Sequence, residues 1–133
     1  MENKLRGKGF TLVEIMIVVA IIALLAVIAI PGLLRAKITA NDAAAKATLK
    51  TLSTSSETYA TSQNGNYPGD MASLTTASPP YISVNYCGTT TAGYVYTCTM
   101  SAGGYTFTAT PVTVGTSGTT TYTITTGGVL QGN

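Results

Sequence analysis

The sequence predicts an α+β protein in which a long N-terminal helix packs against a small antiparallel β-sheet. Three observations carry this prediction: residues 10–30 are almost wholly apolar, residues 31–60 have a helical pattern, and residues beyond 81 alternate with a period of two. A chain of 133 residues suffices for one small domain with an appendage. Charged residues make up only 9% of the chain, far below the roughly 25% of ordinary soluble domains. Composition therefore favours a membrane-associated or structural protein.

The N-terminal segment has the length of a membrane span. Three cations, Lys4, Arg6 and Lys8, precede the apolar run FTLVEIMIVVAIIALLAVIAI, which covers residues 10–30. As a helix this run would be about 31 Å long, enough to cross a bilayer core of about 30 Å. An ordinary secretory signal has a shorter apolar region, followed by a small-residue cleavage site. Taken alone, the segment predicts a single-pass anchor with its N-terminus in the cytoplasm.

Glu14 stands out because it is an acid within this apolar run. A carboxylate costs about 2.5–3.5 kcal/mol at mid-membrane on insertion scales. A position in the first helical turn reduces that cost through the helix dipole, but it does not explain why an acid is present. An acid inside a membrane span indicates a function and a partner, so Glu14 is a candidate functional residue.

The string KGFTLVE, residues 8–14, followed by the apolar run, resembles the class III signal of type IV prepilins and type II secretion pseudopilins. The resemblance implies a pilin-like fold and cleavage by a membrane prepilin peptidase between Gly9 and Phe10. It also implies that the new amine of Phe10 is N-methylated. Residues 1–9 would then be a cleaved leader, and Glu14 would be the fifth residue of the mature chain.

Cleavage would place a positive amine on Phe10, beside the apolar run. That amine and the Glu14 carboxylate would each be costly alone in a dry environment. Paired between neighbouring subunits, they offset each other and fix the axial register of a polymer. We therefore expect Phe10 and Glu14 to be assembly residues, and residues 10–30 to serve as membrane span and then as filament core.

Residues 31–60 are expected to continue the helix as an amphipathic spine. Pro31 and Gly32 interrupt the apolar run, so a kink or local break is expected near Pro31. The expected buried stripe consists of Leu34, Ile38, Ala45, Leu49, Leu52 and Tyr59.

Residues 61–133 are expected to form a loop and an antiparallel sheet. The loop covers 61–80, where turn dipeptides and Pro79-Pro80 oppose regular structure. Alternation predicts strands at about 93–100, 104–110 and 120–126. The aromatic face of this sheet would cover the helix stripe, and the Thr-rich face would contact water.

Cys87 and Cys98 enclose ten residues. In an exported domain they are expected to form a disulfide, which contributes about 2–3 kcal/mol in the chain-entropy model. The alternatives are two free buried thiols and a dithiol redox site, but the spacing is not C-x-x-C.

Several function classes are disfavoured by composition. The chain has no His, which excludes His-based acid–base catalysis and His metal sites. Five acids and two Cys leave little for a metal cage, and the calcium site of related pseudopilins lacks its acids because none follows Asp70. We expect no metal, no cofactor and no enzymatic activity, and a net charge of +2 does not indicate a nucleic-acid partner.

The predicted function is a structural subunit of a type IV pilus-like filament, whose main partner is a second copy of itself. Other implied partners are the prepilin peptidase and methyltransferase, the assembly machinery of the inner membrane, and the membrane itself. The precursor would lie in the inner membrane, and the product would be an extracellular filament or a periplasmic pseudopilus. One alternative is a type II secretion pseudopilin, favoured by the piece Gly65-Asn66-Tyr67-Pro68. Another is a single-pass membrane-anchored binding domain, which would need neither cleavage at Gly9 nor an acid at Glu14.

Overall fold

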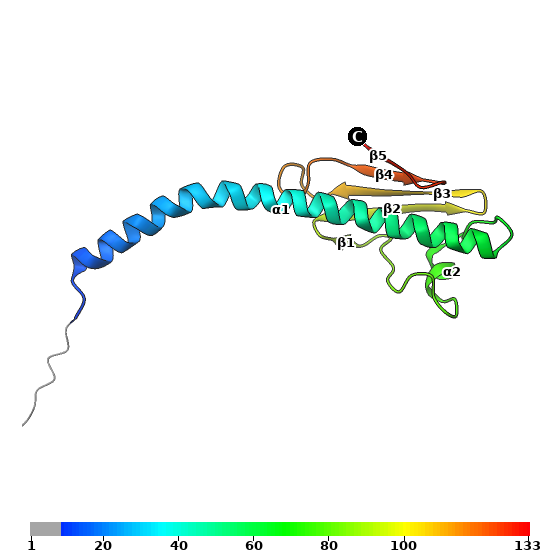
Figure 1. The fold of residues 1–133 in the computed structure, drawn as a ribbon, viewed down its shortest axis with the longest axis horizontal. Helices are drawn as coiled ribbons and strands as arrows, with labels where there is room; N and C mark the ends of the chain where they lie inside the picture. The colour runs from blue at the N-terminus through cyan, green and yellow to red at the C-terminus, as the bar shows by residue number, and fades with distance from the viewer. Residues whose placement is uncertain (1–8) are drawn as a thin grey trace, which may run out of the picture. The chain divides into compact units, whose positions relative to one another are not determined.

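A computed structural model describes residues 9–133, so the predicted leader lies outside the described residues except for Gly9 (Figure 1). The chain divides into two units, one ending at Arg35 and one covering Ala36–Asn133. Long helix α1, Leu12–Ser62, belongs to both units. The second unit also holds a short helix and a sheet, so the α+β class is confirmed.

Helix α1 has 51 residues and includes Pro31. Proline lacks a backbone donor and therefore removes one bond of the helical ladder. The bonds on either side are sufficient to continue the helix, so the local break that we allowed for near Pro31 does not occur. The kink expected at this residue stays a prediction.

The segment 61–80 is not wholly a loop, as the sequence led us to expect. Helix α1 extends to Ser62, and a second helix, α2, covers Met71–Thr75. Asp70 caps α2: its side chain accepts a hydrogen bond from the backbone N–H of Ser73 at 2.8 Å and another from the Ser73 hydroxyl at 2.7 Å. Such caps satisfy backbone donors at a helix start, which is why so short a helix is possible here.

The sheet has five antiparallel strands in the order β1-β2-β3-β4-β5. Their bounds are β1 Thr90–Thr91, β2 Tyr94–Ser101, β3 Gly104–Pro111, β4 Tyr122–Thr125 and β5 Val129–Gly132. Strands β2, β3 and β4 correspond to the three predicted from alternation. The edge strands β1 and β5 were not predicted, because β1 has two residues and every residue of β5 is exposed. A strand without a buried face carries no alternating pattern.

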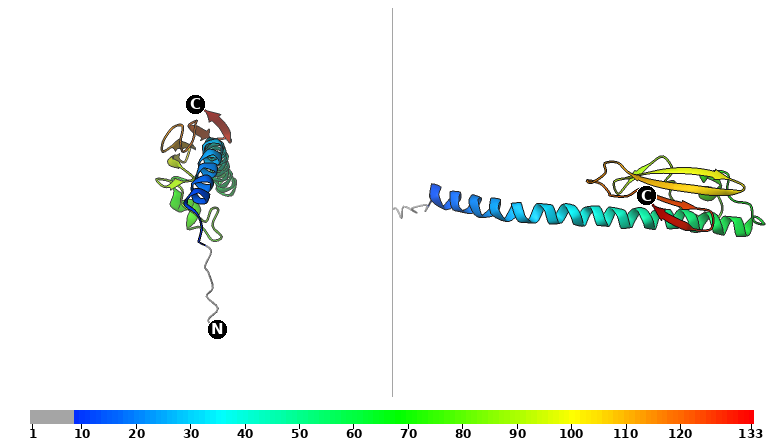
Figure 2. Two further views of the ribbon diagram at one scale, coloured as in Figure 1. Left: turned by 90° about the vertical axis from the view of Figure 1, so that its left-hand side faces the viewer. Right: turned by 90° about the horizontal axis from the view of Figure 1, so that it is seen from above.

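The core of the second unit lies between α1 and one face of the sheet (Figure 2). The helix contributes Ala45, Leu49 and Leu52, which confirms the central part of the predicted stripe. The sheet contributes the predicted aromatic face: Tyr94, Tyr96, Tyr105, Phe107, Ala109, Tyr122 and Ile124. Leu34, at the start of the stripe, is 41% exposed and lies in the other unit.

Candidate assembly site

The residues expected at the processing site lie at the start of the described chain. Gly9 and Phe10 precede α1 outside any helix or strand, both residues are exposed, and Phe10 is 86% exposed. A Cβ built at Gly9 would meet no atom within 4 Å. Packing among the described residues therefore does not require glycine at position 9.

Glu14 and Thr11 form a reciprocal cap at the start of α1. The Glu14 carboxylate accepts hydrogen bonds from the Thr11 backbone N–H at 2.7 Å and from the Thr11 hydroxyl at 2.8 Å. In return, the Glu14 N–H donates to the Thr11 hydroxyl oxygen at 3.2 Å. This is a capping box, which satisfies backbone donors at a helix N-terminus. Sequence reasoning missed Thr11, although residues 11–14 match the capping-box pattern Thr-x-x-Glu before an apolar run.

The first half of α1 exposes apolar side chains on all sides. Every large apolar residue from Leu12 to Leu33 is more than half exposed, and among the described residues α1 is the one helix long and apolar enough to span a membrane. Apolar surface of this extent must be covered by lipid or by other helices. Glu14 is the acid on this surface, and it lies in the first turn of α1.

The second unit is closed by the disulfide between Cys87 and Cys98, whose Cα atoms lie 5.5 Å apart. The bond attaches the segment before β1 to the middle of β2. Both cysteines are partly buried against the core. No described cysteine is free, so the dithiol alternative has no reduced pair here.

Glu57 joins α1 to the far end of the sheet. Its carboxylate accepts hydrogen bonds from the hydroxyls of Tyr105 at 2.7 Å and Tyr67 at 2.9 Å, and from the Gly127 N–H at 2.8 Å. Burial raises the pKa of Glu57, but these three bonds to the ionised form outweigh it, so the net pKa lies below its usual value. Burial, together with the Glu57 carboxylate, raises the pKa of Tyr105 to about 12.

Asp42 makes a matching connection fifteen residues earlier on α1. Its carboxylate accepts from the Tyr94 hydroxyl at 2.6 Å and from the hydroxyl of Thr119 at 2.8 Å. Beside it, the Asn41 amide donates to the Ser117 carbonyl at 2.8 Å. Burial raises the pKa of Asp42, but the bonds from Tyr94 and Thr119 lower it by a larger amount, so the net pKa lies below its usual value. Sequence reasoning gave neither acid a role, because all of their named partners except Tyr67 lie 48 to 77 residues away and leave no local pattern.

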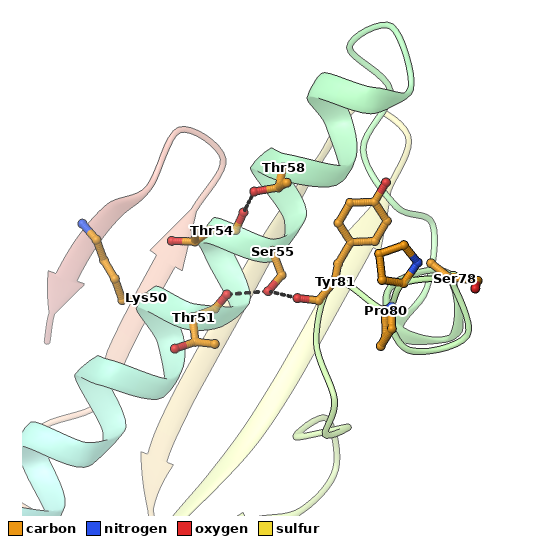
Figure 3. A pocket seen from close by; sticks show the side chains of 10 residues that line it. Lys50, Thr51, Thr54, Ser55, Thr58, Ser78, Pro80 and Tyr81 are labelled. Carbon is orange, nitrogen blue, oxygen red and sulfur yellow. Dashed lines mark hydrogen bonds between the residues drawn. The ribbon is translucent and has the colours of Figure 1, made fainter.

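A hollow of about 680 Å³ lies between α1 and the loop 77–81 (Figure 3). Two of its hydroxyls are bonded to backbone: the Ser55 hydroxyl donates to the carbonyls of Thr51 and Tyr81, and the Thr58 hydroxyl donates to the carbonyl of Thr54. No described residue group of three or more His, Cys, Asp or Glu could hold a metal ion. The residues that line the hollow include no Cys, His, Asp or Glu.

Comparison with known proteins connects both units to one family. A model of the prokaryotic N-terminal methylation motif matches residues 4–30. The type IV wide pilus major component PilA4 of Thermus thermophilus is 35% identical over 109 residues, which cover 79% of this chain and 82% of that protein. The type IV major pilin protein PilA of Myxococcus xanthus is 46% identical over 54 residues, covering 41% of this chain and 24% of that protein. No solved structure matches the chain.

Proposed function

The chain belongs to the type IV pilin family, whose members are structural proteins and not enzymes, and from this premise we propose how it is processed and assembled. The precursor is inserted in the inner membrane through residues 10–30, with its N-terminus in the cytoplasm. A prepilin peptidase removes residues 1–9, and the Phe10 amine is methylated. The mature chains then polymerise with one another into an extracellular pilus as its major subunit.

The observation that carries this proposal is the contrast between the two halves of α1. The second half is covered by a sheet and contributes to a closed core. The first half buries nothing, yet it carries one carboxylate at its N-terminal end. A lipid environment alone satisfies the apolar surface, whereas a helical polymer also gives the carboxylate a cation.

In the proposed polymer, Glu14 exchanges the partner it has in the single chain. Thr11 supplies two donors to the carboxylate before assembly. In the filament, the amine of a neighbouring subunit's Phe10 supplies a full positive charge. A pair of opposite full charges adds a Coulomb attraction that the neutral donors of Thr11 lack, so the exchange favours assembly and selects one axial register.

The substitution Glu14→Ala tests this pairing. It leaves the Phe10 amine buried without a partner, and breaking a buried pair from one side costs on the order of 3–5 kcal/mol. The variant is expected to enter the membrane and accumulate there as monomer, while the yield of sheared filaments collapses. Quantitative immunoblotting of the membrane and sheared fractions measures both.

Thr11→Val is the matched control. It removes the hydroxyl bonds of the capping box but keeps the carboxylate. Filaments are expected from Thr11→Val, because the charge pair is intact. Normal filament yield from Glu14→Ala would refute the pairing, and equal loss in both variants would assign the defect to the helix cap. Absence of filaments in the parent strain would favour the membrane-anchored binding domain.

A further inference from the structure

The face of the sheet that does not contact α1 carries a regular grid of threonines. In the register of the strands, Thr97 pairs with Thr108, and Thr108 with Thr123. One step along, Thr99 pairs with Thr106, and Thr106 with Thr125. These six residues of β2, β3 and β4 are the threonine face. Their spacing is about 4.8 Å across the strands and roughly 6.7 Å along them.

The threonine face is open to solvent. Thr97 and Thr99 are exposed, and the other four are half-buried. Thr108 and Thr123 approach within hydrogen-bonding distance, 3.3 Å between hydroxyl oxygens. Each position therefore presents a methyl group and a hydroxyl that can donate or accept.

The part of the sequence that forms the threonine face carries no charged side chain. Residues 71–133 contain no Asp, Glu, Lys, Arg or His. Lys46 lies over the Tyr122 ring, on the opposite, helix-covered face of the sheet. An uncharged face has no attraction for anionic nucleic acid or anionic lipid. It also has no repulsion toward a copy of itself, and its mixed donors and acceptors make it self-complementary.

We propose that the threonine face mediates lateral association of filaments, by pairing with the same face of a subunit in a neighbouring filament. This inference rests on the proposed function, because it requires the filament. The sheet covers α1 with its other face, so the threonine face lies on the side away from the filament spine. Uncharged segments of high β-propensity are the sequences that pack face to face in dry, interdigitated layers.

The size of the face determines which assembly it stabilises. Six strand positions at these spacings cover roughly 200–300 Å² of surface. Stable protein pairs bury about 800 Å² on each partner, so two isolated subunits do not form a dimer through this face. Two filaments that lie side by side repeat this contact at every subunit along their length. Because the weak contacts are linked, their combined affinity is high. The partner is thus a second copy within a polymer and not a free subunit.

The test uses filaments sheared from cells and washed, examined by negative-stain microscopy and low-speed sedimentation. Thr108→Lys places a charge at the centre of the face, so bundles are expected to be lost at low salt while single filaments persist. Salt of about 1 M, where the screening length is about 3 Å, should restore part of the bundling. Thr116→Lys adds the same charge on an exposed loop residue outside the face and is expected to bundle like the parent.

Thr99→Lys is the second variant, because its exposed position lets the lysine reach water without disturbing the sheet. If either lysine variant yields filaments that bundle as the parent does, the inference is overturned. Equal loss in Thr116→Lys, or bundles that vanish when polysaccharide is digested, would overturn it as well. A parent with filaments but no bundles defeats this inference alone. A parent without filaments defeats the proposed function and this inference together.

Discussion

At the scale of single residues, Asp42 and Glu57 are the acids that fasten the sheet to the helix. They lie fifteen residues apart on α1, which is about 22 Å along the axis. Asp42 holds the end of the sheet near Thr119, and Glu57 holds the turn after β4 at Gly127. The apolar core lies between these two attachments. Apolar packing supplies most of the stability of such a layer, and the two carboxylates specify its register.

Acid should weaken this layer. The folded-state pKa values of Asp42 and Glu57 are depressed, so their contribution is fully present above the unfolded values of about 4 and is lost as pH falls through the folded values. We expect the thermal midpoint of the second unit to be flat from pH 7 to about 5 and to fall below about 4. Near-ultraviolet circular dichroism of the full chain in detergent measures this through the buried tyrosines.

Two variants separate this effect from general acid sensitivity. Glu57→Gln should lower the free energy of unfolding by about 1–3 kcal/mol at pH 7, because hydrogen bonds to a charged acceptor are lost. It should also flatten the acid dependence. Asp70→Asn alters an acid whose pKa is lowered by bonds to Ser73 alone, so its acid profile should stay closer to that of the parent than the profile of Glu57→Gln does. A Glu57→Gln profile as steep as that of the parent would contradict the assignment.

At the scale of elements, the disulfide supports the weakest edge of the sheet. Strand β1 has two residues, paired with Val95 and Tyr94 of β2. Reducing Cys87–Cys98 opens a loop of ten residues, worth about 2–3 kcal/mol in the chain-entropy model. We expect faster amide exchange at Gly88 and Tyr96, whose backbone bonds join the two sides of this loop, and little change in β3 or β4.

Peptide mass spectrometry with and without reductant checks the linkage, and hydrogen exchange shows which amides exchange faster once the disulfide is reduced. The double variant Cys87→Ser with Cys98→Ser is the control, because reductant should not alter its exchange. Free thiols in freshly purified filaments would contradict the linkage. Uniform acceleration through β3 and β4 would show that the disulfide supports the whole sheet instead of one edge.

The elements that the sequence predicted are those with a buried face. Alternation identified β2, β3 and β4 because their inward residues, such as Tyr94 and Phe107, are fully buried. The same logic found the helix stripe through Leu49. It missed β5, which buries nothing, and α2, whose start depends on a cap at Asp70. The polar attachments at Asp42 and Glu57 were also missed, because contacts between distant segments depend on the folded arrangement.

At the scale of the whole molecule, the two units differ in what they need. The unit from Ala36 to Asn133 has a core, a disulfide and satisfied acids of its own. The unit before it exposes an apolar helix that is stable only in lipid or among other helices. In the proposed function, this chain lies in a membrane first and enters a polymer afterwards. The step between these states must change the N-terminal end of the helix and leave the folded sheet unchanged.

The predicted cut at Gly9-Phe10 is such a step, and it leads to the final prediction. It removes Glu2, Lys4, Arg6 and Lys8, a net charge of +2, and leaves four cationic and four acidic side chains. Because a side chain at position 9 would touch no described atom, Gly9→Val should fold normally, and any defect reports recognition by the peptidase.

We expect Gly9→Val to remain uncut, to accumulate in the membrane with its leader, and to give no filaments. Gly32→Val is the matched control: its Cβ also meets no atom within 4 Å, so it should be processed like the parent. Intact mass and N-terminal sequencing distinguish a chain starting at methylated Phe10 from one that keeps its leader. Leader residues found on sheared filaments of the parent would sink the processing scheme, since the amine that pairs with Glu14 exists only after the cut. Filaments from uncut Gly9→Val would refute the proposed pairing of the Phe10 amine with Glu14, because they would assemble without a free Phe10 amine.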